Sequence, residues 1–106
     1  MMASLTRLQG LYYIVSGIWP LVHFTSFELL TGPKHDRWLV RTVGLLAAAI
    51  GVTLVRRPRE SRGLAAVSAA SFAIADVDAT LAGQPPVYLA DAVLEAALFV
   101  AHRAGR

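Results

Sequence analysis

Four apolar stretches, each close to the length that crosses a bilayer, make up most of this chain. They cover about residues 8–30, 38–55, 64–82 and 87–103, and glycine, proline or clustered charge separates each from the next. A membrane-spanning helix needs ~20 mainly apolar residues, with a range of ~17–25. Charged residues make up only 16% of the chain, whereas a soluble domain contains about 25%. We therefore predict an all-α integral membrane protein, in which residues 1–106 form one four-helix bundle with four transmembrane helices.

Basic residues are distributed unequally between the two sides of such a bundle. The side with both termini and the loop between the second and third stretches has seven: Arg7, Arg56, Arg57, Arg59, Arg62, Arg103 and Arg106. The other side has Lys34, Arg37 and Arg41. Because Lys and Arg favour the cytoplasmic side, we expect both termini in the cytoplasm and a multi-pass location in the cell inner (plasma) membrane. The expected partner is the lipid bilayer and not nucleic acid, which requires a continuous basic face.

Acidic residues inside the apolar stretches are the second constraint. Asp76, Asp78, Asp91 and Glu95 lie within apolar runs, and Glu28 lies at the end of another. Ionisable groups in a bilayer are costly, face the protein interior or water, and mark functional sites. At ~1.5 Å per residue, Glu95 falls near the middle of its stretch, while Asp76 and Asp91 fall ~5–6 Å to the outer side. We expect these acids to share one layer in the outer half of the membrane.

His23 and Arg41 fall in the same layer by the same reckoning. Arg41 is able to neutralise one acid, or to anchor its own helix at the interface. Acids without a basic partner in apolar surroundings either stay protonated or hold a cation. The layer is therefore expected to respond to protons or cations.

Helical spacing decides which acids can act together. Asp91 and Glu95 are four residues apart and share a face, with Tyr88 one turn before Asp91. Asp78 is rotated ~200° from Asp76, so a regular helix cannot point both at one site.

Polar and aromatic residues of the first stretch recur in steps of four and three. Tyr12, Ser16, Trp19, His23 and Ser26 form a single stripe if residues 8–30 are one helix. Pro20 lies beside the stripe and is expected to bend the helix or to free a carbonyl.

Small residues predict how the helices meet. Gly44, Ala48 and Gly51 form one small-residue surface, and Ala65, Ala69 and Ala73 form another. Close backbone approach drives helix association in lipid. Two interpretations remain open: packing within one bundle, and a homodimer.

The leading functional hypothesis is an acidic pocket in the outer half of the bilayer. It binds or transports a proton, a metal cation or a small cationic or lipophilic molecule. The candidate ligand-binding residues are Glu95, Asp91, Asp76, His23, Arg41, Trp19, Tyr88 and Trp38. Neither a His-Glu-x-x-His motif nor a phosphate-binding loop occurs, and the sequence assigns no metal site and no cofactor.

Two alternatives remain. In the first, the chain is an accessory subunit of a membrane complex, and its acids pair with basic residues of a partner. In the second, the chain is an intramembrane enzyme that acts on a lipid or apolar substrate. The enzyme would use a carboxylate and His23 as acid and base, and we expect it less than a non-enzymatic role. Glu28 is expected to form an interfacial ion pair with Arg37 or Lys34, which adds little stability.

Four short apolar segments, an outward Thr31–Lys34 loop and acids in the third and fourth segments resemble the architecture of small bacterial inner-membrane protein families. The resemblance implies the membrane location and transfers no functional residue.

Overall fold

The computed structural model describes residues 2–105, and within this range the chain is all-helical with no strand. Its five helices are α1 (Met2–Val22), α2 (Phe24–Thr31), α3 (Arg37–Arg56), α4 (Arg62–Leu81) and α5 (Val87–Ala104). The prediction of an all-α chain is confirmed. Loops begin where the sequence has Gly32 and Pro33, Arg57 and Pro58, and Gly83 to Pro86, as the breaks between the apolar stretches indicated.

Two helices, α3 and α4, are long and apolar enough to cross a membrane. The bent pair of α1 and α2 makes a third candidate if it counts as one span. The 18 residues of α5 contain Asp91, Glu95 and Arg103, and this helix is not among the candidates. Two or three candidate spans are compatible with a membrane location; the four-span bundle stays a prediction.

The first apolar stretch is not one helix, and here the sequence prediction is wrong. The chain bends by 115° between α1 and α2, where His23 leaves the helical region with φ −144° and ψ 84°. Pro20 lies one turn before the break and has no N–H to donate. The His23 Nδ1 accepts the backbone N–H of Ser26 at 3.2 Å and begins α2. The predicted stripe from Tyr12 to Ser26 therefore ends at His23.

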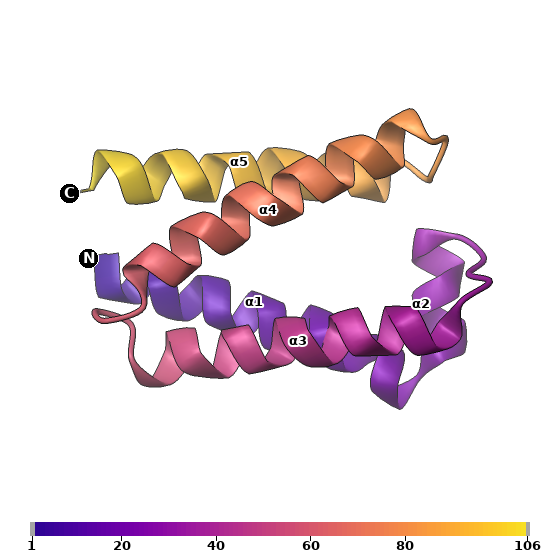
Figure 1. The fold of residues 1–106 in the computed structure, drawn as a ribbon, viewed down its shortest axis with the longest axis horizontal. Helices are drawn as coiled ribbons and strands as arrows, with labels where there is room; N and C mark the ends of the chain where they lie inside the picture. The colour runs from indigo at the N-terminus through magenta and orange to yellow at the C-terminus, as the bar shows by residue number, and fades with distance from the viewer. Residues whose placement is uncertain (1, 106) are drawn as a thin grey trace.

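The long helices form two antiparallel pairs (Figure 1). In one, α1 lies along α3; in the other, α4 lies along α5; the pairs touch each other at few places. The start of α1, the end of α5 and the α3–α4 loop lie at one end of the molecule. We name it the terminal end, and we name the opposite end, with α2 and the α4–α5 loop, the α2 end.

Glycine allows α1 and α3 to approach closely. A Cβ built on Gly10 would lie 2.7 Å from the carbonyl oxygen of Gly51, and one built on Gly44 would meet the backbone of Gly17. The small-residue surface of α3 thus packs against α1 of the same chain, so packing within one chain is the interpretation that the structure supports. Ala65 and Ala69 of α4 are fully buried.

The two pairs meet in a buried cluster of Tyr13, Leu54 and Ala65, with Phe72 packed against it. Toward the α2 end, α4 diverges from α3 (Figure 1), and α2 folds back into this region. The core thus lies toward the terminal end.

Candidate functional site

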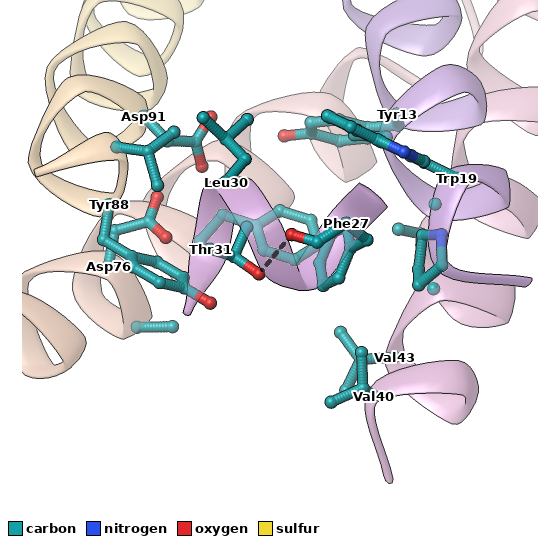
Figure 2. Close-up of a pocket in the computed structure, with 18 of the residues that line it drawn as sticks. Tyr13, Trp19, Phe27, Leu30, Thr31, Val40, Val43, Asp76, Tyr88 and Asp91 are labelled. Atoms are coloured by element: carbon teal, nitrogen blue, oxygen red, sulfur yellow. Dashed lines mark hydrogen bonds between the residues drawn. The ribbon is translucent and has the colours of Figure 1, made fainter. Parts of the chain in front are cut away.

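A partly open cavity of about 590 Å³ lies among all five helices. Figure 2 shows side chains of α2 reaching into it between the two helix pairs. The lining residues that matter below are Tyr12, Tyr13, Trp19, Phe27, Lys34, Phe72, Asp76, Tyr88, Asp91 and Glu95. Most of the wall is apolar, and the volume is in the range of small-molecule sites.

Three of the predicted acids converge on this cavity. Asp76 comes from α4 and is 7% exposed, and Glu95 comes from α5 and is 2% exposed. The side chains of Asp76 and Asp91 both line this cavity and lie near each other in it (Figure 2). The Oδ2 of Asp76 is buried and has no donor among the described residues. Two carboxyls in contact cannot both be ionised at low cost, so this pair is suited to share a proton.

Two consecutive tyrosines of α1 each bind one acid of α5. The hydroxyl of Tyr12 donates to Oδ1 of Asp91, and the hydroxyl of Tyr13 donates to Oε1 of Glu95 at 2.7 Å. Because Asp91 and Glu95 are one turn apart, α1 fixes both carboxyls from across the gap between the helix pairs. Hydroxyl donors favour the ionised form of an acceptor carboxyl.

A buried hydrogen-bond chain extends from Glu95 toward the terminal end. Gln9 Nε2 donates to the Tyr13 hydroxyl and to the Ala65 carbonyl, each at 2.9 Å. Since this fixes the amide orientation, Gln9 Oε1 is the acceptor for His102 Nε2 at 2.7 Å. In this series of hydrogen bonds, every donor points toward Glu95. We name Glu95, Tyr13, Gln9 and His102 the relay; all four residues are buried.

Aromatic groups surround the acids. Trp19 lines the cavity, donates from Nε1 to Ser26 Oγ at 2.7 Å and packs edge-on against Phe27. Tyr88 lies near the α2 end, where the Lys34 ammonium is 5.0 Å from the centre of its ring. Lys34 Nζ also donates to the Thr31 carbonyl at 2.6 Å. These contacts tie the loop after α2 to the start of α5.

The structure does not bring every candidate to the cavity. His23 is exposed and bonds to Ser26; Arg41 is exposed and forms no ion pair with an acid in the described range; Trp38 is 69% exposed. His23 is misplaced because the helix breaks there, whereas Arg41 and Trp38 lie in the first two turns of α3 and are exposed. Arg41 therefore does not neutralise the acids.

Two predictions about the other acids agree with the structure. Asp78 is exposed while Asp76 is buried, as the opposed helical faces required. Glu28 pairs with Arg37 at 3.7 Å, and its Oε2 accepts the backbone N–H of Lys34 at 2.9 Å.

Sequence reasoning missed Tyr13, Gln9 and His102. A signal was present: Gln9 and Tyr13 are four residues apart, and Glu95 and His102 are seven apart, so each pair shares one helical face. Gln9 and His102 lie near the ends of apolar stretches and look like interfacial positions, and only the side-chain hydrogen bonds between α1 and α5 show that these residues are buried together.

The arrangement can hold positive charge. The acids lie in an aromatic-lined cavity, and in residues 2–105 no Lys or Arg is ion-paired with any of the three. No group of three or more His, Cys, Asp or Glu in that range is arranged to hold a metal ion. In comparisons with family models, curated proteins and solved structures, nothing matches this chain.

Proposed function

We propose that this protein binds a small lipophilic organic cation in the acidic cavity and carries it across the membrane. The observation that supports the proposal is the convergence of Asp76, Asp91 and Glu95 on one aromatic-lined cavity without a basic partner among the described residues. A carboxylate in an apolar site attracts a cation strongly, since little water screens the charge. Aromatic faces add cation–π attraction.

The proposed membrane arrangement has four spans, with the bent α1–α2 pair as the first and α5 as the fourth. Both termini and the arginine-rich α3–α4 loop share one end of the molecule, and basic residues favour the cytoplasmic side. Arg106, one of the seven basic residues, lies outside the described range. In this arrangement the termini are cytoplasmic, and the cavity lies in the outer half of the bilayer.

The alternatives receive less support. An enzyme that uses His23 needs this imidazole near a carboxylate, yet His23 is exposed and does not line the cavity. An accessory subunit needs acids that a partner's basic residues can reach. The acids instead line a cavity among this chain's own helices, which suits a small ligand better than a protein surface.

The test is binding of tetraphenylphosphonium, an aromatic organic cation, to the purified protein in detergent. Trp19 lines the cavity and Trp38 does not, so a Trp38→Phe background leaves one reporter at the site. We expect saturable quenching of Trp19 fluorescence. Combining Asp91→Asn with Glu95→Gln should weaken binding at least ~150-fold, since each charged contact is worth about 1.5–3 kcal/mol.

Asp78→Asn is the matched control, because it removes an exposed carboxylate of α4 outside the cavity. It should leave the affinity unchanged. Equal affinities in the control and in the double variant would contradict the proposal, as would quenching that does not saturate.

A further inference from the structure

We propose that the organic cation and a proton compete for the Asp76–Asp91 carboxyl pair, so that each cation bound releases one proton. This inference rests on the proposed function and adds its coupling ion. It makes the site an exchanger of cation against proton.

The hydrogen bonds locate the proton on Asp76. Asp91 accepts the hydroxyl of Tyr12 and Glu95 accepts the hydroxyl of Tyr13, so each of these carboxyls has a donor suited to a negative charge. Asp76 has no such donor within the described chain, and its Oδ2 is buried and unpartnered. It lies near Asp91 in the wall of the same cavity (Figure 2). A proton on Asp76, directed at Asp91, avoids two like charges in contact.

The surroundings give this pair no other neutralising charge. The titratable groups that line the cavity are Tyr12 and Tyr13 on α1, Asp76 on α4, Tyr88, Asp91 and Glu95 on α5, and Lys34 in the loop after α2. The parts of α2 and α3 that line it contribute no titratable group. Lys34 is engaged with the Thr31 carbonyl and the Tyr88 ring. A proton or a ligand must therefore supply the positive charge.

The exchange leaves the net charge of the site unchanged, because one positive charge enters and one leaves. A cation enters beside Asp91 and lies against both carboxyls, the O–H bond of Asp76 breaks, and the proton leaves to water. The cation then replaces the proton as the partner of two adjacent negative charges. When a proton returns to Asp76, the attraction for the cation falls and the cation leaves. Because the two states alternate, a proton gradient across the membrane would drive movement of the cation.

The experiment measures the dissociation constant of tetraphenylphosphonium as a function of pH in detergent. By proton linkage, release of one proton lowers the dissociation constant about tenfold for each pH unit over the range in which the pair holds its proton. Asp76→Asn replaces the protonated acid by an amide of the same shape that can donate to Asp91. Because the amide mimics the protonated pair, this variant should bind the cation weakly, close to the low-pH affinity of the unmodified protein, with a dissociation constant that no longer depends on pH.

Asp78→Asn, two residues along the same helix and exposed, should keep the pH dependence of the unmodified protein. Calorimetry in two buffers of different ionisation enthalpy counts the released protons in the unmodified protein, so the inference does not depend on the folding of any variant. Binding without pH dependence would overturn the exchange and leave the proposed function standing. A pH dependence that persists in Asp76→Asn would overturn the assignment to this pair. Absence of binding at every pH would overturn the proposed function itself.

Discussion

Tyr13 joins the acidic cavity to the buried polar interior through a single hydroxyl. It accepts from Gln9 Nε2 and donates to Glu95 Oε1. Tyr13→Phe keeps the ring packed against Phe72 and leaves a buried carboxyl and a buried amide each short of a partner. We expect a loss of about 1–3 kcal/mol in the free energy of unfolding, measured by denaturant unfolding in detergent micelles. Tyr88→Phe is the control, because it removes a cavity-lining hydroxyl that is outside the relay and keeps the ring that contacts Lys34; equal stabilities would show that the relay contributes nothing to the fold.

At the scale of helices, the contact between α1 and α3 depends on paired glycines. A Cβ on Gly44 would meet the backbone of Gly17 and lie 3.1 Å from Pro20 Cγ. Backbone cannot move aside as a flexible side chain does, so the helices must separate. We expect Gly44→Ala to lower the unfolding free energy by about 1–3 kcal/mol, measured by thermal unfolding. Gly63→Ala is the matched control, because a Cβ there meets nothing and alanine favours a helix. A Gly44→Ala variant as stable as the control would contradict the close packing.

The helices themselves were largely predictable from the sequence, while the bend in the first stretch was not. Long apolar runs and glycine or proline breaks set the ends of α3, α4 and α5 to within a few residues. Pro20 suggested a distortion, but the chain turns by 115° three residues later, at His23. The turn is stabilised by contacts of Ser26 with Trp19 and His23. Such a local network depends on the space that the other helices leave free. The periodicity of the sequence carries no information about that space.

At the scale of the whole molecule, spacing along single helices identified the acids but not their partners. Asp76, Asp91 and Glu95 were predicted to share one layer of the membrane, and the structure brings all three to one cavity. Depth does not say which face of a helix is covered, so Arg41 and Trp38 were assigned to the site although both are exposed. The pairing of α1 with α3 and of α4 with α5 decides these faces. It also creates the cavity, which no single element contains.

The orientation of the molecule can be tested because the chain contains no cysteine. Glu60→Cys places a thiol in the arginine-rich α3–α4 loop, and Gln84→Cys places one in the α4–α5 loop at the α2 end. Basic residues favour retention of a loop in the cytoplasm. In intact cells, a membrane-impermeant maleimide should therefore label Gln84→Cys and not Glu60→Cys, and both should react after the membrane is permeabilised. The reverse pattern would place the cavity in the inner half of the bilayer. Labelling of both positions in intact cells would mean that α4 does not cross the membrane, and the four-span arrangement would then be wrong.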